Sequence, residues 1–216
     1  MGKPVKGVSG RGPGRRGDQA RATRRRIVDA AAGLFIRHGY AATTLEQVAE
    51  RAGVAVQTVY FHFGNKRTLL KQAVDIAAAG DDEPVPLLGR PWLEQARAEP
   101  DPQRVIALWV HASREILGRI GPIMRVVRDA AGADPDMAAQ WDTNEQQRMT
   151  AFRLLAQMLA DRDALQLGMS VDEAADIIFA LLSIELYLLL TVNRGWAPAR
   201  WEHWTTSMLT SALLPQ

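Results

Sequence analysis

Apolar residues recur at intervals of three and four along most of the chain, which is the spacing of one face of an α-helix. The first run, at about residues 20–38, includes Ile27, Leu34 and Phe35. It ends at Gly39, a residue type that readily adopts the left-handed conformation of a helix end. No stretch shows convincing strand alternation, and no segment repeats. The pattern therefore predicts an all-α fold.

Helix-start signals divide the rest of the chain. Asp101 and Asp134 each precede a proline at a first helical position, and "SVDE" at 170–173 has the spacing of a capping box. Thr43 and Glu46 in "TTLE" have the same spacing. Beyond the acidic, proline-bearing loop "GDDEPVPLLGRP", the expected helices lie at about residues 102–118, 121–131, 135–163, 171–194 and 198–213. The result is a small N-terminal module followed by a larger helical bundle.

The composition excludes several kinds of chemistry. A chain of 216 residues, 47% of them hydrophobic, can bury a substantial core. The absence of cysteine excludes a disulfide framework, a thiolate zinc site and a cysteine nucleophile. The most apolar stretch, "IIFALLSIELYLLLTV", has sixteen residues, contains Ser183 and Glu185, and falls short of a membrane span. No secretory-type apolar run follows the basic N-terminus, so we expect a cytoplasmic protein without a membrane partner.

The net charge of +2 conceals an asymmetry along the chain. Residues 1–26 contain nine Lys or Arg and one Asp, so this end carries +8 and the remainder carries −6. Residues 1–19 also have few large apolar side chains, which predicts a disordered basic arm. A basic end suits a polyanionic partner because phosphates release counterions when they meet it. A tail that only keeps the protein soluble is the alternative interpretation.

A helix-turn-helix pattern occupies "TTLEQVAERAGVAVQTVYFHF", residues 43–63. The first helix ends at Gly53, and a second short helix follows a tight turn. In the second helix Val56, Val59 and Phe63 share one face, which predicts a buried seam. The next helix is expected to begin at an asparagine cap and to run to a glycine, as the segment "NKRTLLKQAVDIAAAG" indicates.

The opposite face of the second helix carries Gln57, Thr58, Phe61 and His62, with Tyr60 at its edge. Lys and Glu are the ordinary solvating choices for such a face. Gln and Thr can instead bond base edges, an aromatic ring can pack on a thymine methyl, and Tyr or His can donate to phosphates. The face therefore suits a DNA major groove. The alternative is loop packing in an unrelated helical protein.

The segment "TTLEQVAERAGVAVQTVYFHFGNKRTLL" resembles the DNA-binding signature of the TetR family of transcriptional regulators, over about residues 24–75. The shared features are the threonine that opens helix two, the Gly-Val turn, Thr-x-Tyr-x-His-Phe and the Asn-Lys pair. The resemblance implies a two-domain, all-helical homodimer that binds a palindromic double-stranded DNA operator and is released by a small-molecule effector. It makes residues 20–66 the helix-turn-helix DNA-binding domain and residues 67–216 the effector-binding and dimerisation domain.

Residue by residue, the resemblance implies phosphate contacts from Thr43 or Thr44, Tyr60, His62 and Lys66. It assigns base reading to Gln57, Thr58 and Phe61. A phosphate near Lys66 would also meet the free amides of a helix N-terminus. The chain departs from the family pattern at Ala55, where a serine often caps the helix, so we expect this cap to be weaker or supplied from elsewhere.

Dimerisation is expected at the two closing helices, residues 171–194 and 198–213. The first is apolar nearly all round, and such a helix needs burial on every side. Its own subunit and a partner together would supply that burial. A fully enclosed core helix in a monomer is the alternative.

Enzyme signatures are absent from the sequence. There is no HExxH, paired-carboxylate cluster, phosphate-binding glycine loop or serine elbow, and we expect no cofactor and no metal. His111 and Glu115 form an i, i+4 pair, but lone histidines on amphipathic helices are usually packed or solvated. We therefore expect a ligand-responsive regulator, a repressor, rather than an enzyme. The alternative is a helical small-molecule-binding protein or enzyme whose N-terminal module binds no DNA.

Large aromatic and flexible methionine side chains can line an effector cavity, although most are expected in the core. The candidate ligand-binding residues are Trp92, Trp109, His111, Met124, Trp141, Met149, Phe152 and Glu185.

Glu185 is the one charge in "FALLSIELYLLLTV", and a helical wheel puts it on an apolar stripe with Ile178 and Leu188. Burial without a partner would cost several kcal/mol. One possibility is an arginine partner, such as Arg114, Arg125 or Arg128, or a hydrogen-bonded position at the dimer seam. The other is the effector cavity, where the carboxylate would accept hydrogen bonds from a largely apolar ligand with a donor or positive charge.

Overall fold

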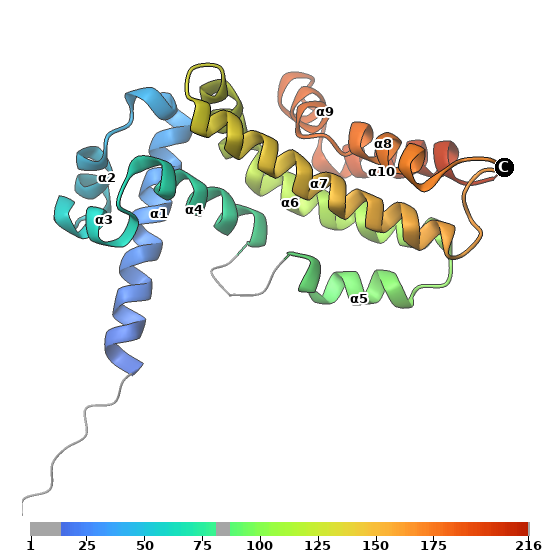
Figure 1. Cartoon of the computed structure of the whole chain (residues 1–216), viewed down its shortest axis with the longest axis horizontal. Helices are drawn as coiled ribbons and strands as arrows, with labels where there is room; N and C mark the ends of the chain where they lie inside the picture. The colour runs from blue at the N-terminus through green and yellow to red at the C-terminus, as the bar shows by residue number, and fades with distance from the viewer. Residues whose placement is uncertain (1–13, 81–86, 216) are drawn as a thin grey trace, which may run out of the picture.

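The computed structural model describes residues 14–80 and 87–215, and these residues form helices and turns without a strand (Figure 1). The all-α prediction is confirmed. The predicted arm up to residue 13 and residues 81–86 of the predicted acidic loop lie outside the described residues. The N-terminal module contains α1 (Gly14–Ala42), α2 (Leu45–Ala52), α3 (Val56–Phe63) and α4 (Lys66–Ala79). The bundle contains η1 (Leu87–Gly89), α5 (Pro91–Ala98), α6 (Pro102–Ala131), α7 (Pro135–Ala160), α8 (Val171–Leu181), α9 (Ile184–Leu188), η2 (Leu189–Asn193) and α10 (Pro198–Leu213).

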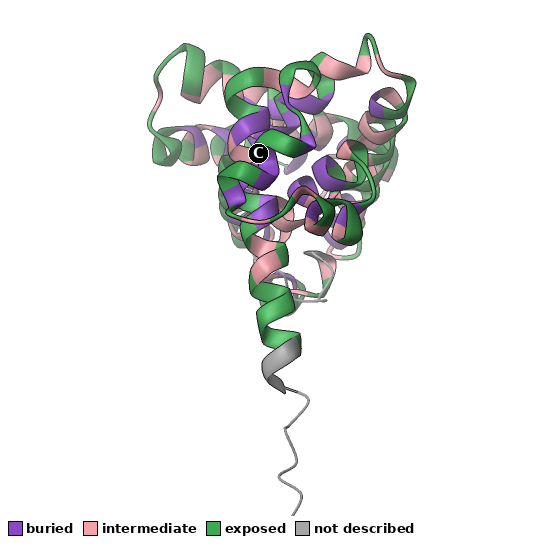
Figure 2. Cartoon of the chain, turned by 90° about the vertical axis from the view of Figure 1, so that its left-hand side faces the viewer, coloured by how far each residue is buried: buried purple, intermediate pink, exposed green. Residues whose placement is uncertain are grey.

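Helix α1 begins earlier than the sequence pattern predicts. Residues 14–19 were expected in the arm but are helical. Among them Arg15, Arg16 and Gln19 are good helix formers, and they extend the helix toward the N-terminus. The first turns project away from the rest of the protein (Figures 1 and 2). At the other end Gly39 has φ 79°, a left-handed value that interrupts the helix where the glycine signal predicts.

The capping box of α2 lies one residue later than predicted. Thr43 is buried, and its hydroxyl donates to the Gly39 carbonyl oxygen at 2.8 Å. Thr44 is therefore the N-cap, paired reciprocally with Gln47 rather than Glu46. The other predicted caps are confirmed; they are Asn65, Asp101, Asp134 and Ser170, the last in a capping box with Glu173.

Residues 102–131 form one helix, α6, where two helices were predicted. Gly118, Gly121 and Pro122 resemble a helix stop in the sequence, yet they have a packing role. A Cβ on Gly118 would lie 3.4 Å from the Tyr187 hydroxyl, and one on Gly121 would lie 3.1 Å from Leu188 Cδ2. The glycines thus let α9 approach α6 closely. Pro122 removes one backbone donor, which packing against several neighbouring helices outweighs.

The predicted helix at 171–194 is broken after α8. Ser183 is extended, with ψ 147°, and its hydroxyl accepts from the Leu186 amide at 3.2 Å as the cap of α9. The break changes the helical phase, so Ile184 is buried and Glu185 is exposed. The apolar-stripe prediction for Glu185 is therefore wrong, although Arg128 is near, with Nη1 3.9 Å from its carboxylate.

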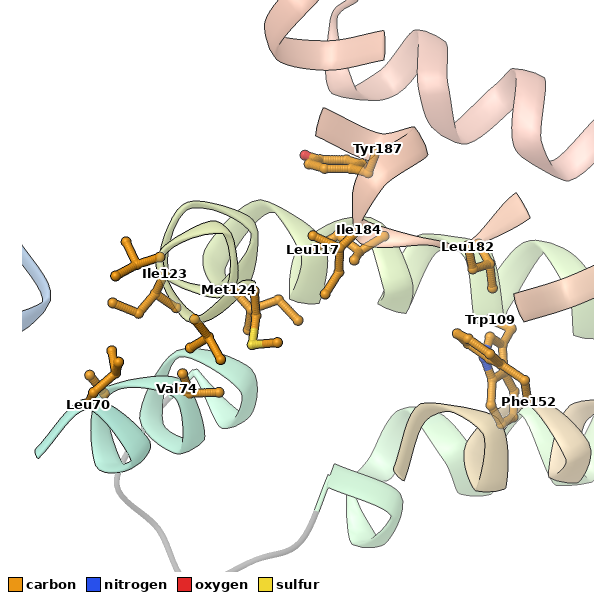
Figure 3. Close-up of a cluster of buried hydrophobic side chains, with 14 of the residues drawn as sticks. Leu70, Val74, Trp109, Leu117, Ile123, Met124, Phe152, Leu182, Ile184 and Tyr187 are labelled. Carbon is orange, nitrogen blue, oxygen red and sulfur yellow. The ribbon is translucent and has the colours of Figure 1, made fainter. Parts of the chain in front are cut away.

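Helix α5 was not predicted as a helix, and it lies on one side of α6 and α7 with α8, α9 and α10 on the other (Figure 1). The core runs between these layers and into the N-terminal module. Leu70 and Val74 of α4 lie beside Ile123 and Met124 of α6 (Figure 3). The two modules therefore share one hydrophobic core.

The apolar segment is longer than the sixteen residues noted in the sequence. Val171–Asn193 is long and apolar enough to cross a membrane by length and composition, and only 28% of its most apolar window is buried within the described chain. The break at Ser183 interrupts its backbone hydrogen bonding, which a lipid interior would not replace. The segment leaves apolar surface that its own subunit does not cover.

The register of the α2 cap can be tested by substitution. Thr44→Ala should lower the free energy of unfolding by about 1 kcal/mol, because the first amides of α2 lose their acceptor. Thr68→Ala is the control, since that exposed side chain forms no hydrogen bond in the described structure, and its effect should stay within about 0.5 kcal/mol. Urea denaturation measures both; equal effects would contradict the assigned cap.

Candidate functional site

The seam predicted for α3 is present, because Val59 and Phe63 are buried and Val56 is half-buried. The opposite face is open to solvent. Phe61 is 85% exposed, Tyr60 is 49% exposed and Gln57 is also exposed. Thr58 and His62 are half-buried at its borders. The helix lies at the outer edge of the N-terminal module, away from the bundle (Figure 1).

The start of α3 has no side-chain cap. Gly53, with φ 64° and ψ 43°, makes the left-handed turn between α2 and α3, and Ala55 then offers no side-chain acceptor to the first amides. The weaker side-chain capping expected from Ala55 is therefore observed at the start of α3. Amides at a helix start can donate to an anion such as a phosphate, because the helix dipole favours negative charge there.

Lys66 holds the N-terminal module together. Its ammonium donates to the carbonyl oxygens of Tyr40 at 2.8 Å, Thr43 at 2.9 Å and Ala41 at 3.4 Å, and it lies 4.4 Å from the Tyr40 ring centroid. Partial burial lowers the pKa of Lys66, opposed by the charge of Asp134. The start of α4 is thereby tied to the segment between α1 and α2.

The sequence left open whether Thr43 or Thr44 contacts a phosphate, and the structure places the two side chains differently. Thr43 is buried against Gly39, whereas Thr44 is exposed at the start of α2. Arg24 of α1 donates to Gln72 Oε1 at 2.6 Å and lies 5.6 Å from the Phe63 ring centroid. One basic residue of α1 is thus fixed beside the end of α3.

A cavity of about 700 Å³ lies in the bundle, between α4, α6, α7 and the α8–α9 junction. Of the eight candidate ligand residues, Trp92, Trp109, Met124 and Phe152 line it. The rings of Trp92 and Trp109 pack edge to face, with centroids 5.1 Å apart. Figure 3 shows Trp109 and Phe152 with Leu182, and Met124 nearer to α4. The volume is in the range of small-molecule sites.

The other four candidates lie outside the cavity lining. His111 is exposed, and its Nδ1 lies 2.9 Å from the Glu202 carboxylate on α10, which also pairs with Arg114. Trp141 and Met149 are half-buried against the core, and Glu185 is exposed near Arg128. His111 therefore joins α6 to α10, as an exposed polar contact, and does not face the cavity.

A sequence profile described as bacterial regulatory proteins of the tetR family matches residues 27–73. The HTH-type transcriptional regulator TtgR of Pseudomonas putida is 41% identical over 58 residues, which are 27% of this chain and 28% of TtgR. The structure of NalD, the secondary repressor of the MexAB-OprM multidrug efflux pump in Pseudomonas aeruginosa, aligns with a TM-score of 0.67 at 22% identity, over 92% of this chain and 99% of NalD. Residues 27–73 therefore carry the N-terminal module of the TetR family, and the whole chain shares its fold with NalD.

A second structure similar to this chain is the SmeT–triclosan complex, with a TM-score of 0.71 and 23% identity over 90% of this chain and 93% of SmeT. The match to TtgR spans little more than a quarter of either protein. The likeness to NalD and SmeT concerns the fold of the whole chain.

Several residues that line the cavity were not found from the sequence. They are polar and lie on α6 and α7; they are Ser113, Asn144, Gln147, Arg148 and Thr150. Asn144, Gln147 and Arg148 share one face of α7 at helical spacing, so a polar stripe facing inward could have been noticed. Polar residues also cover the outer face of α7, which hides that stripe in the sequence pattern.

The role of Lys66 can be tested without DNA. Lys66→Met should lower the free energy of unfolding by about 1–2 kcal/mol, because three carbonyl oxygens lose a charged donor that is only partly shielded from solvent. Lys71→Met is the control, since Lys71 forms an exposed pair with Asp75 at 3.0 Å. Thermal and urea unfolding measure the stability of both variants. A Lys66 variant as stable as the control would contradict the stabilising role of the three Lys66 hydrogen bonds, which we call the Lys66 clamp.

Proposed function

We propose that this TetR-family protein is a transcriptional repressor that binds a palindromic DNA operator as a homodimer and releases it when a small molecule enters the cavity. The observation that carries the proposal is the solvent-exposed face of α3. An aromatic ring as exposed as that of Phe61 contributes little to folding, because apolar area stabilises only when it is removed from water. A DNA groove would bury that ring and engage its polar neighbours.

The DNA contacts are proposed from side-chain chemistry and exposure. Gln57, Thr58 and Phe61 read base edges and thymine methyl groups. Bordering polar groups position the protein on phosphates; these are the exposed Thr44 and Tyr60 and the half-buried His62. Lys66 adds positive charge near the same edge while its N–H donors hold the module together. Thr43 acts indirectly, because its buried hydroxyl fixes the turn that presents Thr44.

Exposed apolar surface on the closing helices supports a homodimer. Val192 is 61% exposed, and Leu189 and Met208 are also exposed large apolar residues. Helices α8 and α10 pack side by side on one face of the bundle (Figure 1). A second copy would cover this face and set two α3 helices against successive major grooves, which requires a spacing of about 34 Å.

Helix α4 supports the release step. Val74 and Ala78 line the cavity, and the same helix begins at the Lys66 clamp. A ligand that displaces α4 would therefore reorient the module that carries α3. NalD is described as a repressor and SmeT as binding triclosan, which is in keeping with a repressor that accepts small molecules in this fold.

DNA binding is tested by gel shift with the region upstream of the protein's own gene. Gln57→Ala or Phe61→Ala should lower specific affinity by about 1–3 kcal/mol per lost base contact while leaving the unfolding temperature unchanged. Gln146→Ala, on an exposed position of α7, is the control. If wild-type protein fails to retard that DNA specifically, even at low salt, the alternative without DNA binding gains support.

The dimer is tested by sedimentation of the full chain. Leu189→Glu combined with Val192→Glu should convert the dimer into a folded monomer, because two charges would be buried at the seam without partners. Leu167→Glu is the control, since Leu167 is fully exposed in the α7–α8 loop. If the double variant remains a dimer, the dimer interface lies elsewhere on the protein. If the wild-type protein associates with membranes, the exposed apolar surface has a lipid partner instead.

A further inference from the structure

One charged side chain on the cavity wall lacks an ion-pair partner among the described residues. Arg148 of α7 faces the cavity among largely apolar neighbours. Its guanidinium lies 4.6 Å from the Phe179 ring centroid and 5.9 Å from that of Phe152, so aromatic faces hold its plane. Its Nε and Nη2 atoms are buried and have no hydrogen-bond partner within residues 14–80 and 87–215.

The nearest carboxylates do not neutralise Arg148. Burial lowers its pKa, and the charges of Glu185 and Glu145 oppose this shift from a distance without forming an ion pair. Glu185 is exposed and lies near Arg128 instead. An arginine remains protonated even when burial disfavours its charge, so the cavity wall carries a half-buried cation whose Nε and Nη2 atoms are removed from solvent. Such a group costs free energy unless a partner satisfies it.

The two unpartnered atoms define the partner's shape. Nε and Nη2 form one edge of the guanidinium plane, with two parallel N–H donors. This edge matches the two oxygens of a carboxylate, which accepts both hydrogen bonds at once. A cationic ligand has no comparable partner, because Asp75, the carboxylate that lines the cavity, pairs with Lys71 at 3.0 Å.

We propose that the effector is an apolar carboxylic acid, bound through the carboxylate by the Nε–Nη2 edge of Arg148. The apolar body lies against Trp92, Trp109 and Phe152, within the cavity of about 700 Å³. The assignment rests on the proposed function, since it names the ligand class of the same cavity. It also explains why α7 carries an inward arginine whose guanidinium faces aromatic rings.

The test compares acids and alcohols that share an apolar body. Calorimetry of the full chain is run with biphenyl carboxylate against biphenyl methanol, and with octanoate against octanol. Wild type should bind at least one acid about tenfold or more tightly than its alcohol, the effect of a charge-assisted hydrogen-bond pair in a desolvated site. Arg148→Met should abolish this preference without weakening the alcohol, and Arg153→Met, an exposed arginine of α7 paired with Asp172, should retain it.

Two further readouts separate a binding role from a structural one. Arg148→Met should unfold at the same or a higher temperature than wild type without ligand, because it removes an unpaired buried charge. Arg148→Lys, which keeps the charge and loses the paired edge, should show a reduced preference if the methionine variant does not fold. A large loss of stability in both variants would assign Arg148 to the structure and overturn the proposal.

Equal affinity for acid and alcohol in wild type, no binding of either acid, or a preference that survives in Arg148→Met would each overturn the carboxylate assignment. The same preparations are assayed for DNA retardation. Intact specific DNA binding together with any of these outcomes rejects the carboxylate assignment alone. Loss of DNA binding by wild type rejects the proposed regulatory function separately.

Discussion

The arrangement of the whole chain depends on how the two ends of α4 are held by cations. At its start, Lys66 donates to the carbonyl oxygens of Tyr40, in the last turn of α1, and Thr43, between α1 and α2. At its end, Arg119 of α6 donates to the carbonyl oxygens of Ala77 at 3.0 Å and Ala78 at 3.2 Å. Helix ends leave such carbonyls without internal partners, and the helix dipole makes them attractive to positive charge. The helix α4 is therefore fixed to the rest of the N-terminal module by one cation and to the bundle by another.

Coupling between the two modules follows from this attachment. Leu70 and Val74 pack against α6, and Val74 also lines the cavity (Figure 3). Packed interiors resist small continuous deformation, so in the proposed release step a ligand in the cavity would favour a discrete change in the position of α4. Arg67, the residue after Lys66, pairs with Asp134 and Asp136 at the α6–α7 turn. A movement of α4 would therefore either break or preserve this second charged contact.

Local chemistry made much of the fold predictable. Capping residues followed by proline placed the starts of α6 and α7, and the Gly-Val turn with its apolar seam placed α2 and α3. The predictions that failed did so because of contacts that the sequence pattern alone does not show. Gly118 and Gly121 resembled a stop because the partner that needs them, α9, is distant in sequence. Glu185 was placed on the wrong face because Ser183 could cap a new helix. Four of the eight predicted ligand residues line the cavity, whereas Arg148 could not be assigned before its neighbours were known to be aromatic rings.

Apolar groups are usually buried, and charged groups are usually exposed or paired. Two features of the isolated chain depart from this arrangement. Large apolar residues, Val192 among them, face solvent, and the guanidinium edge of Arg148 is buried without a partner among the described residues. Each raises the free energy of the chain when it is alone, and each is relieved by a different binding event. Under the proposed function, a partner subunit would cover the first whether or not the cavity is filled, whereas a carboxylate ligand would relieve the second only in conformations in which Arg148 reaches the ligand. Only such differential affinity can shift a conformational equilibrium.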